Sequence, residues 1–403
     1  MPFLSQLGGG GDIVSTIVWF VLFFVMIFLY PKMMISQTIW QLEKSAAELE
    51  SLDARAQSIA LRKMSKNPSK QQRAGMKRFM EFFAVGPVDL DPAGIIRKID
   101  LVSRRADYKF KYFVSQMMPK ANVEEQSNIK NAIAGAMTTH QIAKIVRHFL
   151  ETVKKYKIFQ LAMILQMQIP MIARIAKAAL GATSAFADGI PVGDGIGPMV
   201  ASTLIGKQKA KFYSEDEFVV CEKKIAGKKV FVSKAWGPGA STGMPGKFLK
   251  KFTAKNKITR IVTVDAALKM EGEIPGSVAE GVGVAMGGSG VDRYEIEEFS
   301  VKNNIPLDAI AIKMSDEEAI MPMRKEIYEA IPDAIELVKE VIARGPKNEK
   351  ILLIGVGNTC GVGNDEDSFD KTVKVSMERA AKTEAERKKE EKGGILSSLG
   401  MQM

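Results

Sequence analysis

Cysteine and histidine are scarce in this chain of 403 residues, which contains Cys221, Cys360, His140 and His148 and no others of either type. Two cysteines cannot build a disulfide framework, and so low a content is typical of a reducing compartment. With so few thiols and imidazoles, a structural zinc site, which uses four cysteine or histidine ligands, is not expected. A bound metal would need carboxylate ligands, which suit a hard divalent cation such as Mg²⁺ or Mn²⁺. The sequence alone identifies no metal ligand.

Complete nucleotide-binding motifs are also lacking. The glycines of Gly195-Ile-Gly197 and Gly281-Val-Gly283 are not accompanied by the rest of the dinucleotide-binding fingerprint. No Gly-Lys-Ser or Gly-Lys-Thr phosphate loop occurs either. A nucleotide- or phosphate-binding domain is therefore a minor alternative.

One long uncharged hydrophobic run is present near the N-terminus. Ile13–Tyr30 lies between Asp12 and Lys32 and is just long enough to cross the roughly 30 Å hydrocarbon layer of a bilayer. A signal peptide fits poorly, because no Lys or Arg precedes the run and no small-residue cleavage site follows it. Residues 1–31 are therefore predicted to be a permanent single-pass anchor in the cell membrane. Since the basic residues follow the run, the N-terminus should lie outside and the C-terminal body in the cytoplasm.

Residues 32–78 are predicted to form a basic, coiled-coil-like helix. An apolar stripe along Gln41–Met64 indicates self-association, a partner helix or packing against its own chain. Arg62–Arg78 then contains Lys and Arg but no Asp or Glu. Because the anchor lies just upstream, we expect this run to face anionic lipid headgroups, with a solvated face as the alternative. Nucleic acid is not the expected partner, because no aromatic residues alternate with the basic ones.

The following segment, residues 79–187, is expected to be helical. Within it, Ile158–Leu180 is apolar but contains several glutamines and Pro170. This composition favours a buried or interfacial helix over a second membrane span. A charged helical tail, residues 366–403, is predicted at the C-terminus.

Residues 188–365 are predicted to form an α/β domain with a mainly parallel or mixed sheet and helices on both faces, because β-type runs alternate with helical ones. The predicted strands are Phe218–Cys221, Lys229–Ser233, Lys257–Asp265, Ala279–Met286, Leu307–Lys313 and Lys350–Gly357, and the predicted helices are Tyr294–Asn303 and Pro322–Arg344. Ligands bind such sheets beyond the carboxyl ends of the strands, so residues at those ends are candidate site residues.

The main candidate loop is the stretch from Asp188 to Pro198, Asp-Gly-Ile-Pro-Val-Gly-Asp-Gly-Ile-Gly-Pro. It is too rich in glycine and proline for a regular element, and Pro198 suits the first turn of a following helix. Asp194 in this loop and Asp265 at a predicted strand end are candidate catalytic acids. Each could instead cap a helix, which for Asp265 would begin at Ala266. Further candidate binding residues are Asp188, Gly193, Gly195, Gly197, Gly287, Gly288, Gly290, Gly357 and Asn358.

Two resemblances rest on these residues. Over its full length the chain resembles an uncharacterised archaeal membrane-anchored family, a domain of unknown function, through the Asp188–Pro198 stretch and Gly355-Val-Gly-Asn-Thr359. Locally it is similar to the spore germination protease and the hydrogenase-maturation endopeptidases. The segments that carry this second resemblance are Val192–Pro198 for the first aspartate loop, Thr263–Leu268 for the second aspartate and Gly287–Val291 for a glycine loop.

The protease resemblance implies that Asp194 and Asp265 are the catalytic acids of a peptidase-like, aspartate-dependent hydrolase. Two nearby carboxyls cannot both ionise easily, so one, expected to be Asp194, would activate water while the other protonates the leaving group. The same pair could hold a divalent cation. One feature departs from that family, in which a Gly-x-Gly-Asn strand end comes just before the first aspartate. Here Gly355–Asn358 comes late in the domain, so the sheet would have to be circularly permuted.

The rival interpretation is a non-enzymatic, membrane-associated scaffold or binding protein. The separation of the two carboxyl groups distinguishes the two functions, because acid–base partners must reach one substrate.

Overall fold

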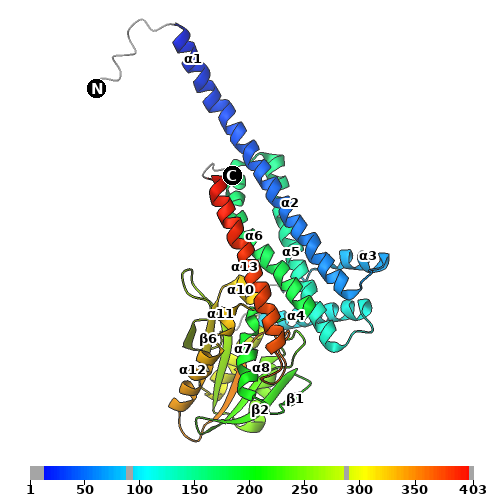
Figure 1. Cartoon of the computed structure of the whole chain (residues 1–403), viewed down its shortest axis with the longest axis vertical. Helices are drawn as coiled ribbons and strands as arrows, with labels where there is room; N and C mark the ends of the chain where they lie inside the picture. The colour runs from blue at the N-terminus through cyan, green and yellow to red at the C-terminus, as the bar shows by residue number, and fades with distance from the viewer. Residues whose placement is uncertain (1–12, 88–93, 286–289, 399–403) are drawn as a thin grey trace, which may run out of the picture. The chain divides into compact units, whose positions relative to one another are not determined.

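The computed structural model describes residues 13–87, 94–285 and 290–398. These residues belong to two compact units. One contains the residues up to Ala54 together with Thr139–Ala176, and the other contains Arg55–Thr138 together with the residues from Lys177 onward. Helices make up the first half of the chain and a seven-stranded sheet with flanking helices the second (Figure 1), which confirms the predicted fold class.

The first unit begins with one long helical stretch. Helix α1 (Ile13–Phe24), a π-helical turn η2 (Val25–Leu29) and α2 (Tyr30–Met64) follow one another without a break. Apolar side chains on α1 are exposed, with 73% of Trp19 accessible. The long apolar N-terminal helix predicted from the sequence is therefore present. By length and composition, α6 (Phe159–Asp188) is also apolar enough to cross a membrane, although it contains Pro170; its predicted buried or interfacial position stays a prediction.

In the first unit, α2 lies antiparallel to α5 (Val123–Tyr156). Three ion pairs join the two helices, and the residue numbers rise along one as they fall along the other: Glu43 with Lys154, Glu50 with Arg147, and Asp53 with His140. The apolar stripe of α2 is buried, including Leu42, Leu49 and Leu52. The stripe therefore packs within its own chain, which is one of the arrangements that the sequence had left open.

The second unit contains a helical core next to its sheet. Helix α3 (Lys70–Phe79) starts at a capping box, in which the Ser69 hydroxyl accepts the Gln72 N–H and the Gln72 side chain accepts the Ser69 N–H. Because α2 ends at Met64 and α3 begins at Lys70, the basic segment predicted as one helix consists of two. Helix α4 (Ile95–Met117) follows, and buried apolar side chains of α2, α3, α4 and α5 form one cluster. Within it the rings of Phe79 and Phe113 stack at 4.1 Å between centroids.

The sheet is mixed, with strand order β1-β2-β3-β7-β4-β6-β5. Strands β3, β7, β4 and β6 are parallel, whereas β1, β2 and β5 join antiparallel at the two sides. The strands are β1 (Lys211–Tyr213), β2 (Phe218–Ile225), β3 (Lys228–Ala235), β4 (Arg260–Leu268), β5 (Val278–Val282), β6 (Leu307–Met314) and β7 (Lys350–Gly355).

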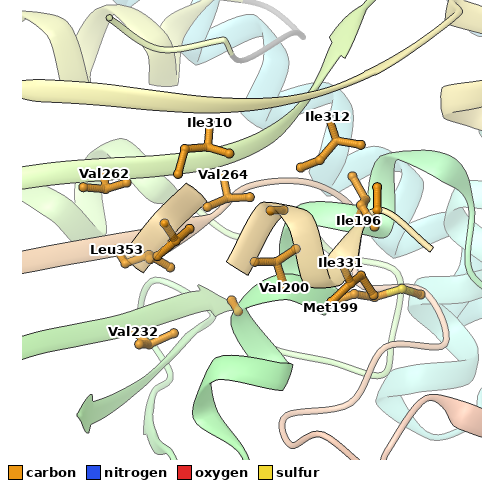
Figure 2. Packing of buried hydrophobic residues seen from close by; sticks show 14 of the residues in the cluster. Ile196, Met199, Val200, Val232, Val262, Val264, Ile310, Ile312, Ile331 and Leu353 are labelled. Carbon is orange, nitrogen blue, oxygen red and sulfur yellow. The ribbon is translucent and has the colours of Figure 1, made fainter. Parts of the chain in front are cut away.

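Helices cover both faces of the sheet. On one face, α7 (Ile196–Ile205), α12 (Ile331–Arg344) and α13 (Asp370–Ser398) pack on alternate residues of the central strands, such as Val262 of β4. Figure 2 shows Met199 and Val200 of α7 within this cluster. On the other face, α8 (Pro245–Asn256) and α9 (Val291–Asn303) pack on the intervening residues, such as Ile261.

The structure refines several local predictions. Strand β4 does not end at Asp265 but continues to Leu268, and no helix begins at Ala266, so the helix-cap interpretation of Asp265 is wrong. The helix predicted from Pro322 to Arg344, with a possible break at Pro332, is indeed divided next to that proline into α11 (Lys325–Tyr328) and α12, because Pro332 lies in the first turn of a new helix. The short helix α10 (Asp316–Ile320) was not predicted.

Candidate functional site

The loop that contains Asp194 lies against the carboxyl ends of β4 and β7. Residues Gly193–Gly195 form a 3₁₀ turn that leads directly into α7. A Cβ atom at Gly197 would lie 2.4 Å from the Val264 carbonyl oxygen of β4 and 2.2 Å from that of Val356, just after β7. No side chain fits at these separations, so glycine at this position lets the start of α7 rest directly on two strand ends.

Asp194 is held in place by the segment that follows β7. Its Oδ2 accepts the backbone N–H of Asn358 at 2.8 Å. Gly357 brings the two segments together: it has a φ of +132°, and a Cβ there would lie 1.9 Å from the Asp194 carbonyl oxygen. Asp194 itself is partly exposed. Burial raises the pKa of its carboxyl, and the hydrogen bond from Asn358 lowers it in part.

Asp265 lies on β4, directly after the last residue of that strand that pairs with β7. Its side chain is buried, and its Oδ1 accepts the N–H of Ala266 at 2.7 Å. Burial raises the pKa of Asp265 well above its ordinary value, and the negative charge of Asp194 raises it further. The two aspartates predicted from the sequence therefore lie at the same edge of the sheet, where the charge of Asp194 acts on the pKa of Asp265.

This place is a switch point of the sheet. After β4 the chain passes through β5 to α9 on one face, whereas after β7 it passes to α13 on the opposite face. The carboxyl ends of two neighbouring parallel strands whose connections diverge are the usual ligand position in such sheets. Asp194, Asp265 and Asn358 all lie at this edge.

The structure places the remaining predicted site residues at different positions. Gly193 and Gly195 flank Asp194, and Gly195 lies next to the Asn358 carbonyl. Gly290 is the left-handed N-cap of α9, while Gly287 and Gly288 lie outside the described residues. Asp188, a candidate binding residue, is the last residue of α6 and pairs with Lys63 and Arg379. These two salt bridges join the end of α6 to α2 and α13.

Sequence reasoning missed Lys234, because the predicted strand stopped one residue before it. Lys234 is fully buried on β3, in register with Gly355 of β7. Its Nζ donates to the Ala235 carbonyl at 3.0 Å and to Asn364 Oδ1 at 3.1 Å. The Asn364 side chain also bonds both the N–H and the carbonyl of Gly237. Lys234 thereby fixes the loop that follows Asn358. The sequence did contain a signal for it, because a lysine directly follows the apolar run of the predicted strand.

The burial of Lys234 makes the stability of the protein depend on pH. Burial lowers the pKa of this ammonium group to about 7. Between that value and the ordinary value for lysine, the folded chain binds fewer protons here than the unfolded chain, so stability rises with pH. We expect the parent to gain on the order of 4 kcal/mol relative to Lys234→Met between about pH 7 and about pH 10. Urea unfolding of both proteins at these two pH values measures the difference, and an unchanged difference would contradict the assignment.

The described residues contain no group of three or more His, Cys, Asp or Glu side chains arranged to hold a metal ion. A divalent cation at the sheet edge would therefore have Asp194 and Asp265 as its protein carboxylates, with carbonyl oxygens or water completing its shell. The two carboxyl groups fit such an ion only if Asp265 loses its proton when the ion binds.

Fold and site together define a protein with a long apolar N-terminal helix, a helical region and an α/β domain that carries two aspartates, Asp194 and Asp265, at the carboxyl edge of its sheet. Residues 16–189 match the N-terminal domain of a protein of unknown function, DUF1512, and residues 192–363 match the C-terminal domain of the same family. The chain therefore belongs to the DUF1512 family. Comparison with curated proteins found no match, and comparison with solved structures found none either.

Proposed function

We propose that the α/β domain is an aspartate-dependent hydrolase of peptidase type, and that Asp194 and Asp265 perform its chemistry. The observation that carries this proposal is that Asp194, held by the Asn358 N–H after β7, and the buried Asp265 of β4 lie at the same carboxyl edge of the sheet. The burial of Asp265 is costly for an ionised carboxylate, and it is the kind of environment that tunes a carboxyl to act as an acid at neutral pH.

The two carboxyls have different roles in this mechanism. Asp194 is partly exposed and accepts an N–H, so it is the base that removes a proton from water as the water oxygen attacks the peptide carbonyl carbon. Asp265 retains its proton and donates it to the leaving nitrogen as the C–N bond breaks. At the end of the cycle Asp194 holds the proton and Asp265 is ionised, and exchange with solvent restores the starting state.

The resemblance to the germination protease gains support from one contact. Gly355-Val-Gly-Asn358 is far from Asp194 in the sequence, yet the Asn358 N–H donates to the Asp194 carboxylate. In that family the corresponding strand end precedes the first aspartate. A permuted sheet, in which β7 takes the place of the first strand, would account for both facts.

A cleavage experiment tests the proposal. The full chain in detergent is incubated with a library of synthetic peptides, and new termini are identified by mass spectrometry. We expect cleavage by the parent and by the control Asp188→Asn, because Asp188 is ion-paired with Lys63 and Arg379 and not with the two catalytic candidates. Asp194→Asn and Asp265→Asn should each reduce cleavage by about 10²-fold or more, since each removes one acid–base partner.

The same samples are melted with and without Mg²⁺ or Mn²⁺. A metal-dependent rise in melting temperature that both variants abolish would point to metal-assisted hydrolysis. Absence of both cleavage and a metal effect in every sample would contradict the enzyme proposal and favour a non-enzymatic scaffold or binding protein.

We also propose that the N-terminal helix anchors the chain in the cell membrane, with the body in the cytoplasm. The absence of Lys and Arg before Ile13 supports this orientation. A helix rises about 1.5 Å per residue, so along α2 Arg62 lies about 48 Å from Tyr30. That distance far exceeds the Debye length of about 8 Å at physiological salt. The basic run Arg62–Arg78 can therefore meet the lipid headgroups of this membrane only where α2 lies along the surface.

Removal of the anchor distinguishes membrane attachment through α1 from attachment through the basic run or through α6. A chain that begins at Gln41 should move from the membrane fraction to the soluble fraction after cell lysis, because it lacks α1. Partition between pelleted membranes and supernatant measures the effect. Retention that high salt reverses would indicate that Arg62–Arg78 binds anionic lipid. Retention that high salt does not reverse would show that another segment, α6 being the other candidate, also inserts.

A further inference from the structure

One side of α4 is exposed along most of the helix and carries basic and aromatic side chains together. Residues three or four positions apart lie on the same side of a helix. The exposed residues that form this stripe, which we term the α4 face, are Arg97, Leu101, Arg104, Arg105, Tyr108 and Tyr112. The other side of the helix, with Phe110, Phe113 and Val114, packs into the helical core. The stripe is therefore the side of α4 that is available to a partner.

The α4 face has an excess of positive charge. Asp100, which lies beside the stripe, is already paired with Arg104. Among the residues that the structure describes, no carboxylate pairs with Arg97 or Arg105. The two arginines are therefore available to an anionic partner.

The arginines of the α4 face also line a hollow in the protein surface. The hollow has a volume of about 550 Å³, and the described residues that line it are Arg97, Asp100, Leu101, Arg104, Arg105 and Tyr108. A guanidinium group is planar and presents its donors in a fork that matches two oxygens of a phosphate. The lining therefore suits a phosphate that is attached to a flat, apolar group.

Tyr108 and Tyr112 provide ring surfaces next to these charges. They lie one helical turn apart and are 58% and 54% exposed, with ring centroids 6.4 Å apart and planes inclined by 21°. Unpaired bases stack on exposed aromatic rings, whereas the phosphates of the same strand bind basic side chains. The basic run Arg62–Arg78 contains no aromatic residue, so α4 has the combination that the run lacks.

We propose that the α4 face binds single-stranded nucleic acid, RNA or DNA, with its arginines on the phosphates and its tyrosines stacked on the bases. From Arg97 to Tyr112 the face is about 22 Å long, which accommodates several nucleotides. Anionic lipid suits the face less well. Ala56 of α2, which packs in the same core as α4, lies about 39 Å along that helix from Tyr30, far beyond the Debye length of about 8 Å.

Oligonucleotide binding tests the proposal. The full chain in nanodiscs of neutral phosphatidylcholine is titrated into fluorescein-labelled oligouridine, oligodeoxythymidine or duplex DNA, each about 20 nucleotides long, and fluorescence anisotropy reports binding. Both single strands should bind at low salt and bind more weakly as salt rises. The stronger of the two identifies the preferred sugar. The duplex should bind less tightly, and equal or tighter binding of the duplex would contradict stacking on unpaired bases.

Substitutions on the α4 face distinguish stacking from charge. Tyr108→Ala should weaken single-strand binding about tenfold or more, whereas Tyr108→Phe, which keeps the ring, should bind as the parent does. Arg105→Gln should also weaken binding, and it should reduce the slope of log K against log salt by about 0.7, the value for one lost phosphate contact. Tyr108→Ala should leave that slope unchanged. Because both side chains are exposed, all three variants should keep the melting temperature of the parent.

The matched control is Lys339→Gln, which removes one exposed positive charge from α12, on the other face of the sheet from α9. It should bind as the parent does. Absence of binding by the parent, equal binding by Tyr108→Ala, or equal weakening by Lys339→Gln would overturn the inference. Nitration of Tyr108 by tetranitromethane, mapped by mass spectrometry, should decrease when oligouridine binds. Protection by phosphatidylserine in the nanodiscs, without nucleic acid, would instead assign the face to anionic lipid and overturn the inference as well.

Discussion

Asp265→Asn is expected to raise the free energy of unfolding at neutral pH while it abolishes hydrolysis. The pKa of Asp265 is raised well above its ordinary value, chiefly by burial and then by the charge of Asp194. Above about pH 4 the unfolded chain ionises this carboxyl while the folded chain keeps it protonated, so the parent loses stability as pH rises. The loss is about 1.4 kcal/mol for each pH unit until the folded pKa is reached. Asparagine resembles the protonated carboxyl in shape and does not titrate.

Urea unfolding at about pH 4 and at about pH 8 checks this result, with Asp188→Asn as the control. The difference between parent and Asp265→Asn should be smallest in acid and should grow with pH in favour of the variant. A residue whose removal stabilises the fold but eliminates activity is retained for function. If Asp265→Asn were instead strongly destabilising at both pH values, Asp265 would be a structural residue.

Gly197→Ala is expected to cause a large loss of stability. The new Cβ would meet two backbone carbonyl oxygens, those of Val264 and Val356, at 2.4 and 2.2 Å. Backbone atoms of two strand ends cannot shift without displacing α7 and the Asp194 loop that precedes it. We expect a loss of about 3–5 kcal/mol in the free energy of unfolding, together with loss of any activity. Urea unfolding of the full chain measures it.

Gly281→Ala provides the control. Gly281 lies on the edge strand β5, and no atom lies within 4 Å of the position of an added Cβ. Its replacement should change stability by less than about 0.5 kcal/mol and leave activity unaltered. A similarly small effect at Gly197 would contradict the close approach of α7 to the strand ends, and with it the position of Asp194.

Much of the fold could be predicted from the sequence because local patterns specify it. The hairpin of β2 and β3, the buried strand β7 and the start of α7 near Pro198 are fixed by turn chemistry and hydrophobic runs within a few residues. Asp194 could be predicted for the same reason. It lies in a glycine loop before a helix, and that local arrangement is visible in the sequence.

The rest of the site depends on contacts between distant segments. The hydrogen bond from Asn358 to Asp194 exists because β7 inserts between β3 and β4, and no local pattern reports that strand order. The extension of β4 beyond Asp265 depends on pairing with β6, whose end lies much later in the chain. Asp188 resembles a site residue in the sequence, and only the positions of Lys63 and Arg379 reveal its salt bridges.

The coupling between the two carboxyl groups can be measured directly by infrared titration. The carbonyl stretch of a protonated, buried carboxyl is followed with pH in the parent, Asp194→Asn and Asp265→Asn proteins. Because the charge of Asp194 helps to raise the pKa of Asp265, the Asp265 signal should persist to neutral pH in the parent and disappear at lower pH in Asp194→Asn. It should be missing from Asp265→Asn. A signal of Asp265 that titrates identically with and without the Asp194 carboxylate would contradict a functional pair.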